Sequence, residues 1–408
     1  MQLTYQCNDC DSIFESEKTE YLCPRCSSKN KPDSPPLGVL RVLYNYAAIK
    51  KQSANLLSFL INKDFLPLLP IQNTDSLPFL RVGKTPLYRI KKQSATVFLK
   101  DDSLNPTFSF KDRASAIVSA YAKENNIQTI VAASTGNAGS SLAGICAAQN
   151  QKAVIFVPAA APKAKLTQIM MYGAQIVPVA GNYDMAFDLS VEITRKYGFY
   201  NRNTAFNPLT IEGKKTVSFE IVQQLNGDVP DKIFVPVGDG VIISGVFKGF
   251  EDLLALGIIC KMPQIIAVQA KGSSNIIDNL DSETFISNPS KTIADSISVD
   301  IPRNFYMAKK YIKKYNGLGL KVSDEEILNA SKTLTSMFGV FSEPAASTAY
   351  AGFLKLQSQN MIKQNEKVLI LLTGSGLKDL NAVQPLLHMP APVEANIGAV
   401  EQFLNLKK

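Results

Sequence analysis

Lys111 stands where a lysine could act as a nucleophile. It follows Ser109 and Phe110 at the end of an irregular stretch, just before a helix that we predict for residues 113–125. The positive end of a helix and apolar neighbours both disfavour the ammonium form, so they lower the pKa of the amine, as a Schiff-base lysine requires. A single lysine near a helix start is usually solvated, so Lys111 alone does not decide the chemistry.

Three further loops follow predicted strands and carry groups that could bind an anion or a heterocycle. Residues 134–141 combine small residues and hydroxyls with Asn137, which predicts a nest of N–H donors. Residues 238–245 begin Gly-Asp-Gly, whose glycines would let the backbone approach a phosphate, with Asp239 pointing to solvent. Thr373 ends another strand, where its hydroxyl could meet a ring nitrogen. Each loop alone is also compatible with an ordinary turn.

Four cysteines near the N-terminus have the spacing of a metal site. Cys7 and Cys10 form one Cys-x-x-Cys pair, and Cys23 and Cys26 form a second pair after twelve intervening residues. Four thiolates at this spacing suit a tetrahedral zinc ion, and they leave no open position for water, so we predict a structural zinc ribbon over residues 1–30. Paired disulfides or idle thiols are the alternative, and a partner-binding role for the ribbon stays open. We expect metal loss to disorder residues 1–30 and to leave ligand binding elsewhere in the chain largely unchanged.

The remaining pattern indicates how these loops are positioned. Short apolar runs closed by turn residues alternate with helical stretches, which predicts an α/β protein with parallel, helix-covered sheets. The predicted strands are residues 129–133, 153–158, 175–179, 232–237, 264–269 and 367–372, and the predicted helices are residues 113–125, 184–197, 212–225 and 324–337. Ligands in such sheets bind beyond the carboxyl ends of the strands, where three of the four loops lie.

Composition narrows the class further. The chain has 408 residues, is 46% hydrophobic and contains no apolar run of membrane-spanning length, and its N-terminus lacks the features of a signal peptide, so we expect a cytoplasmic protein. The net charge of +8 comes from scattered lysines and arginines, which favours a solvated surface over nucleic-acid binding. His388 is the single histidine, which disfavours Ser–His and Cys–His hydrolases.

The motifs and their order resemble those of threonine synthase, a fold-type-II pyridoxal-phosphate enzyme family. They are Gly-Lys-Thr-Pro-Leu at 83–87, Asn-Pro-Thr-Phe-Ser-Phe-Lys-Asp-Arg at 105–113, Ala-Ser-Thr-Gly-Asn at 133–137, the glycine-rich loop at 238–245, Glu-Pro-Ala at 343–345 and Leu-Thr-Gly-Ser-Gly-Leu-Lys-Asp at 372–379. The resemblance covers about residues 4–390. It implies a tryptophan synthase β-like fold with two parallel-sheet α/β domains behind the zinc ribbon, a large cofactor-binding domain of residues 31–111 and 213–408 and a small domain of residues 112–212.

The resemblance also implies roles for individual residues. Lys111 would be the Schiff-base lysine and would shuttle protons, and Asn137 would hydrogen-bond the phenolic oxygen of pyridoxal 5′-phosphate. The phosphate loop of the cofactor would be Gly238, Asp239, Gly240, Val241 and Ile242, the pyridine nitrogen would meet Thr373, and the substrate would be held by Ser109, Ser134 and Thr135.

The reaction implied is the conversion of O-phospho-L-homoserine and water to L-threonine and phosphate by a lyase, which we expect to form a homodimer. The alternatives are a serine/threonine dehydratase, a phosphoserine-using β-replacement enzyme, or an inactive homologue. Residues 292–299 faintly resemble a dehydratase segment and lack an expected arginine.

Three residues depart from the family pattern at positions near the cofactor and the substrate phosphate. Phe108 replaces a glycine and would add bulk beside the cofactor, while Ala138 and Ile242 replace phosphate-contacting groups. We therefore expect Lys163 and Lys165 to bind the substrate phosphate. Lys214 and Arg113 are further candidates for the same task.

Overall fold

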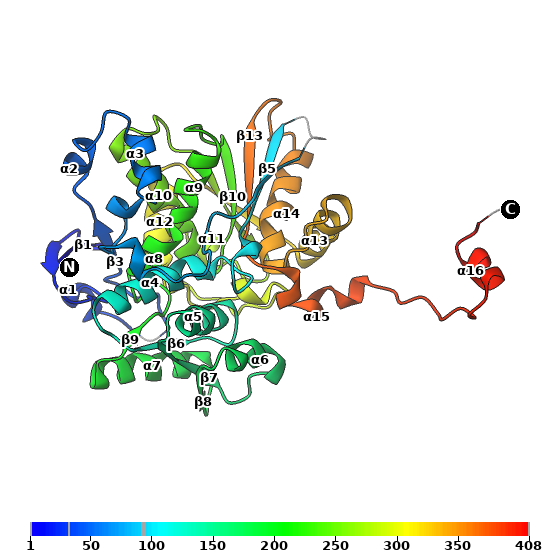
Figure 1. Cartoon of the computed structure of the whole chain (residues 1–408), viewed down its shortest axis with the longest axis horizontal. Coiled ribbons are helices and arrows are strands. Elements are labelled where there is room, and N and C mark those ends of the chain that lie inside the picture. Colours follow the sequence, from blue (N-terminus) through cyan, green and yellow to red (C-terminus); the bar gives the residue numbers. More distant parts are fainter. Residues whose placement is uncertain (1, 32, 91–94, 407–408) are drawn as a thin grey trace.

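The computed structural model describes residues 2–31, 33–90 and 95–406, and within them it contains three sheets (Figure 1). The largest has six strands in the order β12-β11-β10-β13-β5-β4, which are Leu318–Val322, Gln264–Ala270, Lys232–Pro236, Lys367–Leu372, Thr96–Asp101 and Leu87–Ile90. All neighbouring pairs are parallel except β4 with β5. The second is a parallel sheet in the order β8-β7-β6-β9, which are Gln175–Val179, Lys152–Pro158, Thr129–Ala133 and Tyr200–Asn201.

Helices cover these two sheets. Those of at least eight residues are α4 (Lys111–Glu124), α5 (Asn137–Ala148), α6 (Lys163–Met171), α7 (Tyr183–Tyr197), α9 (Thr216–Gln224), α10 (Val241–Leu256), α12 (Phe305–Lys314), α13 (Asp324–Phe338) and α14 (Pro344–Ser358). The shorter ones are α1 (Pro24–Ser27), α2 (Tyr46–Lys50), α3 (Leu56–Asn62), α8 (Leu209–Lys214), α11 (Asn275–Asp278), α15 (Leu380–Val383) and α16 (Ile397–Phe403). None of the helices in the described part of the chain combines the length and the apolarity needed to cross a bilayer.

The predicted α/β class with parallel sheets is confirmed, and the six predicted strands agree with the observed ones to within one residue at either end. Of the predicted helices, the one over residues 212–225 is instead two helices, α8 and α9, which meet at Lys215. The side chain of Lys215 is fully buried and pairs with Glu212 and Asp252, so this residue joins the two helices to α10 rather than facing solvent.

The six-stranded sheet has a hydrophobic core on each face. In β10, Ile233 and Val235 pack with α9, α10 and α12, whereas Phe234 packs with α13 and α14. The same alternation runs through β11 and β13, and Figure 1 shows the two groups of helices on opposite sides of the sheet. Burial on both faces explains why these strands read as continuous apolar runs in the sequence.

The N-terminal segment forms a third, antiparallel sheet of β1 (Leu3–Cys7), β2 (Ile13–Ser16) and β3 (Leu40–Leu43). The third strand comes from beyond residue 30, so the sheet is longer than the segment that the cysteines delimit. Its residues Leu3 and Tyr5 share one hydrophobic core with Val118 of α4 and Ala132 of β6. The cysteine-bearing sheet is therefore packed onto the four-stranded sheet.

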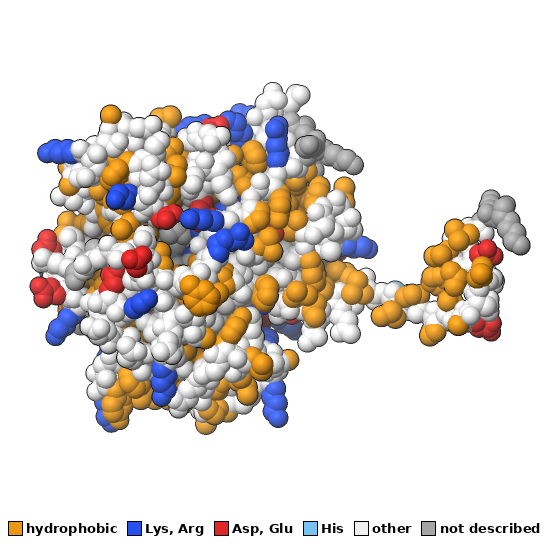
Figure 2. Space-filling model, in the orientation of Figure 1, with side chains coloured by type: hydrophobic (Ala, Val, Ile, Leu, Met, Phe, Trp, Pro, Cys, Tyr) orange, Lys and Arg blue, Asp and Glu red, His pale blue; other side chains and the backbone are white. Residues whose placement is uncertain are grey.

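At the other end of the chain, α16 projects away from the body (Figure 1). In the space-filling view the lysines and arginines of the visible face are scattered, with no continuous basic stripe (Figure 2).

Candidate active site

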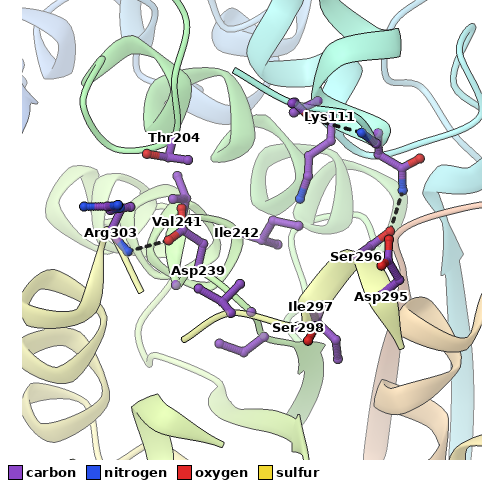
Figure 3. A pocket seen from close by; sticks show the side chains of 18 of the residues that line it. Lys111, Thr204, Asp239, Val241, Ile242, Asp295, Ser296, Ile297, Ser298 and Arg303 are labelled. Atoms are coloured by element: carbon purple, nitrogen blue, oxygen red, sulfur yellow. Dashed lines mark hydrogen bonds between the residues drawn. The ribbon is translucent and has the colours of Figure 1, made fainter. Parts of the chain in front are cut away.

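A cavity of about 430 Å³ lies where loops from both parallel sheets meet (Figure 3). It is lined by residues 134–138 after β6, by residues 236–243 after β10 and by residues 295–301. Single residues from other elements complete it, namely Lys111, Tyr183, Asp184, Arg202, Thr204, Lys214 and Arg303. The cavity thus lies beyond the carboxyl ends of parallel strands, as the sequence predicts.

Lys111 is the first residue of α4, and its side chain reaches into this cavity (Figure 3). Burial lowers the pKa of its amine to about 8, and the nearby Arg202 guanidinium acts in the same direction. Glu343 and Asp239 oppose the shift only in part. The neutral amine, which a nucleophile or a proton acceptor requires, is therefore far more abundant near physiological pH than it is for an ordinary lysine.

The backbone before Lys111 is tied to the loop that contains Thr373. Phe110 N donates to Thr373 O at 2.8 Å, and Ser109 forms a bridge with Gly374. Asp112 anchors the other side of Lys111 by accepting from Thr107 N at 2.7 Å. Two segments that are more than 250 residues apart in the sequence therefore hold Lys111 in place.

Asn137, the first residue of α5, is hydrogen-bonded to a buried acid. Its Nδ2 donates to the Glu343 carboxylate at 3.0 and 3.1 Å and to Ser296 Oγ at 3.3 Å. Burial raises the pKa of Glu343. A Cβ atom at Gly374 would lie 2.2 Å from Glu343 Oε1, so the glycine of the Thr-Gly-Ser-Gly loop leaves room for this carboxylate.

The glycine-rich loop has the geometry of an anion cradle. A Cβ at Gly238 would lie 2.8 Å from Ile297 Cα, and Gly240 adopts a φ of +84°, which favours glycine. Gly240 is also the N-cap of the sixteen-residue helix α10, so free N–H groups point out of the helix end that lines the cavity.

Asp239 does not point to solvent, contrary to the prediction. Its Oδ1 accepts a hydrogen bond from Arg303 N (Figure 3), and its Oδ2 is buried without a hydrogen-bond partner among the described residues. Burial raises the pKa of this carboxyl to about 6. The carboxyl turns inward because the backbone N–H of Arg303 offers it a donor, so Asp239 is part of the cavity wall.

The structure brings together part of the predicted site. Lys111, Ser134, Thr135, Asn137, Gly238, Asp239, Gly240, Val241 and Ile242 all line the cavity. Thr373 is 7% exposed, and its carbonyl accepts the hydrogen bond from Phe110 N, the residue before Lys111. It does not line the cavity. Ser109 is buried, does not line the cavity either, and its Oγ has no hydrogen-bond partner in the described part of the chain.

The cationic candidates for a phosphate fall into two groups. Lys163 and Lys165 lie in the first turn of α6 outside the cavity, and Lys165 pairs with Asp295 at 2.8 Å. Arg113 is buried and pairs with Asp102 at 2.5 Å, so its charge is already neutralised. Lys214, by contrast, lines the cavity.

Phe108 does not add bulk beside the cofactor site. Its side chain is 44% exposed and does not line the cavity, and its backbone has a φ of +69°. The left-handed conformation explains why a glycine would suit this position, because a Cβ atom is disfavoured there.

Among the residues that the sequence motifs did not assign, Arg202 lines the cavity and Glu343 contacts the cavity-lining Asn137. Glu343 belongs to the Glu-Pro-Ala motif, and the structure places it at the N-cap of α14, with Pro344 in the first turn. The sequence feature that could have singled out Glu343 is an acidic residue directly before a run of small residues. Arg202 stands beside a two-residue strand in an asparagine-rich segment, which gives no periodic pattern.

The four N-terminal cysteines converge as their spacing predicts. Their sulfur atoms all lie within 4.8 Å of one another, with Cys7 to Cys26 at 3.8 Å and Cys10 to Cys23 at 3.9 Å. A tetrahedral zinc ion with Zn–S bonds of about 2.3 Å places its sulfur ligands roughly 3.8 Å apart. A disulfide needs about 2.05 Å. The arrangement therefore fits a metal ion and not a pair of disulfides.

Comparisons with known proteins agree with this geometry. A family described as "Pyridoxal-phosphate dependent enzyme" matches residues 79–374. The chain is 32% identical to threonine synthase of Methanocaldococcus jannaschii over 413 aligned residues, and 32% identical to that of Methanosarcina acetivorans over 409, with 98% of each chain covered in both comparisons.

Solved structures with a similar fold are more distant in sequence. The processed threonine deaminase isoform 2 of Solanum lycopersicum superposes with a TM-score of 0.65 at 22% identity, covering 83% of this chain and 95% of that one. Maize serine racemase gives a TM-score of 0.61 at 21% identity, covering 79% and 93%. At this identity the likeness concerns the fold alone.

Proposed function

The chain belongs to the threonine synthase family of pyridoxal-phosphate-dependent enzymes, and we propose that it converts O-phospho-L-homoserine and water to L-threonine and phosphate. Its fold is that of the fold-type-II class. One observation carries the proposal: Lys111, Asn137 and the glycine-rich loop, which come from three separate motifs, line a single cavity.

The residues of this cavity fit pyridoxal 5′-phosphate. A lysine amine of lowered pKa opens into the cavity, and the Gly238–Gly240 turn at the start of α10 offers N–H donors to a phosphate. Lys111 is the residue that would hold the cofactor, and Asn137 would donate a hydrogen bond to it. When bound, the cofactor supplies an electron sink for negative charge on the substrate's α-carbon.

The chain's own groups then handle the protons and the charges. Lys111 accepts the proton from the α-carbon and helps to remove one from the β-carbon, for which its lowered pKa suits it. Ser134 and Thr135, ahead of the N-terminus of α5, are placed to bind the substrate carboxylate. Thr373 and Ser109 lie in the segments that hold Lys111 but do not line the cavity, and contact of the Thr373 hydroxyl with the pyridine nitrogen and of Ser109 with the substrate is part of the proposal.

A second candidate function has one observation in its favour. Residues 295–300 line the cavity with two aspartates and no arginine, an unfavourable surface for a phosphate. Deamination of unphosphorylated serine or threonine would not need a phosphate site. The assay that separates the two functions measures phosphate, ammonia and threonine from a panel of amino-acid substrates.

Loss of Lys111 tests the proposal from the protein side. Lys111→Ala should abolish turnover and the visible absorption band of the cofactor-loaded protein, while the fold stays intact by circular dichroism. Persistence of the band, with borohydride fixing the cofactor to another lysine, would contradict the assignment.

We also propose that Cys7, Cys10, Cys23 and Cys26 bind one structural zinc ion per chain, which elemental analysis tests. We further propose that the enzyme is cytoplasmic and that it forms a homodimer. Light scattering of the purified protein tests the second of these.

A further inference from the structure

Most cations that this chain buries have a carboxylate partner. Lys100 and Arg113 both pair with Glu220, at 2.8 and 2.7 Å. Lys215 pairs with Asp252 at 2.8 Å. Such pairing is the usual requirement for a buried charge, because removal of an isolated ion from water costs several kcal/mol.

Arg202 and Lys214 are exceptions, and both line the cavity. Each is only 2% exposed, and neither has a carboxylate within 4.0 Å among the residues that the structure describes. Arg202 donates from Nε to Ser115 Oγ at 3.2 Å and from Nη2 to the carbonyl of Lys111 at 3.4 Å. Lys214 Nζ has no hydrogen-bond partner within the same described residues.

The backbone of Arg202 and the base of the Lys214 side chain are held in place by their surroundings. Arg202 N donates to Val131 O at 2.8 Å, which fixes its backbone at the end of β9. A Cβ atom at Gly245 would lie 2.6 Å from Lys214 Cβ, so α10 packs directly on this lysine. Two buried basic groups without a carboxylate partner in the described residues are available to an anion, since no internal pair must be broken to bind it.

The electrostatics of the cavity support the same view. Burial lowers the pKa of Lys214 well below its ordinary value, and the positive charges of Arg202 and Lys111 lower it further. Burial likewise lowers the pKa of Arg202 to about 10. Burial therefore disfavours the charged form of both groups, and a bound anion would favour it.

We propose that Arg202 and Lys214 form the binding site for the phosphate group of the substrate. The inference rests on the proposed function and assigns this phosphate to residues other than Lys163 and Lys165, which lie outside the cavity. It also explains how a site that carries Ala138 and Ile242 can hold a dianion. Charge-assisted hydrogen bonds, which are stronger than those from neutral donors, replace the donors that these two positions lack.

The test uses Lys214→Met and Arg202→Met in the cofactor-loaded enzyme, with Lys332→Met as the matched control on the exposed face of α13. Inorganic phosphate is titrated by calorimetry, and KM is measured with O-phospho-L-homoserine. We expect each cavity variant to weaken phosphate binding and to raise KM at least tenfold, and the control to change neither. The melting temperature of the apoprotein should not fall, because each variant removes a buried basic group whose charged form is disfavoured by burial.

Two results would overturn the inference. One is unchanged affinity for inorganic phosphate in both cavity variants, with Lys163→Ala weakening it instead. The other is a loss of affinity for pyridoxal 5′-phosphate itself while the phosphate affinity of the loaded enzyme is kept, which would assign the pair to the cofactor's phosphate.

The inference and the proposed function can fail separately. Wild-type enzyme that binds inorganic phosphate through Arg202 and Lys214, yet releases none from O-phospho-L-homoserine, would support the site and reject the reaction. Wild-type enzyme that turns over this substrate with unchanged KM in both variants would support the reaction and reject the site.

Discussion

Tyr21 of the cysteine ribbon stacks on Phe206, with ring centroids 4.6 Å apart and planes inclined by 7°. Its hydroxyl also accepts a hydrogen bond from Asn201 N at 3.0 Å. These two contacts lie on either side of Arg202 and Thr204, which line the cavity. The ribbon therefore supports one side of the cavity wall, and we expect metal loss to loosen this wall as well as residues 1–30. That cofactor binding stays largely unchanged after metal loss remains a prediction.

Weakening this support should loosen residues 200–206. Tyr21→Ala should cost roughly 3 kcal/mol of stability, as for other large aromatic truncations, whereas Tyr21→Phe, which keeps the stacked ring, should cost about 1 kcal/mol. Hydrogen exchange of residues 200–206 should accelerate in Tyr21→Ala and in chelator-treated wild type. Unchanged protection of that segment after metal removal would show that the ribbon is independent of the site.

Lys111 should leave a signature in the pH dependence of stability. Burial holds its pKa at about 8 in the folded protein, against an ordinary value of 10.5. Between these pH values the unfolded chain binds a proton that the folded apoprotein does not, so Lys111 makes the stability of the apoprotein rise with pH in that window. In Lys111→Met the slope of the free energy of unfolding against pH should be smaller by the equivalent of up to one bound proton. The free energy of unfolding at pH 7 should be higher by roughly 3 kcal/mol.

Urea unfolding of the apoprotein at pH 7.5 and pH 10 measures this effect. Lys332→Met serves as the exposed control and should leave the slope unchanged. An identical slope in wild type and Lys111→Met would mean that the amine is not shielded from solvent.

Phe108 adopts a φ of +69°, where a side chain is disfavoured by about 1 kcal/mol or more. Phe108→Gly should therefore be more stable than Phe108→Ala, although glycine normally lowers stability by about 0.5–1 kcal/mol relative to alanine. Cofactor affinity should be equal in both variants because the side chain does not line the cavity. Thermal unfolding and cofactor titration check the two expectations, and a more stable alanine variant would refute the first.

Glu343 is a buried carboxylate whose removal should stabilise the protein and impair its function. Burial raises the pKa of this acid in the folded protein. The contribution of Glu343 to stability therefore declines as pH rises from the pKa of the unfolded chain towards the pKa of the folded protein. Glu343→Gln removes that cost, so the apoprotein should melt at a higher temperature at pH 7. The Asn137 amide would lose its charged acceptor, and we expect kcat to fall about tenfold or more, in line with loss of a positioned group. Unchanged kcat with raised stability would place Glu343 outside the machinery.

The sequence predicted those strands and loops whose structure is determined by a pattern of neighbouring residues. The strands β6, β10 and β13 are buried on both faces, so their apolar runs are continuous and their ends are marked by turn residues. Lys111, Asn137 and Gly238 were found because each lies in a loop that begins a helix at the carboxyl end of a sheet or beside it. The split at Lys215 escaped prediction because it depends on ion pairs with a separate helix.

The parts of the site that were missed depend on contacts between distant segments. Glu343 meets Asn137 across 206 residues of sequence, and nothing near either residue signals the other. Asp239 turns inward because Arg303 N, 64 residues away, donates to it. The importance of Arg202 is visible only in the structure, and so is the reason to prefer Lys214 over the other candidate lysines, because neither residue has a carboxylate partner within the described residues.

The central claim is that this chain releases phosphate from a phosphorylated four-carbon amino acid. The most direct measurement follows phosphate, threonine and ammonia together after O-phospho-L-homoserine is added to the cofactor-loaded enzyme. The account predicts phosphate and threonine in equal amounts with no ammonia. Faster release of ammonia from unphosphorylated threonine or serine than of phosphate from O-phospho-L-homoserine would contradict it.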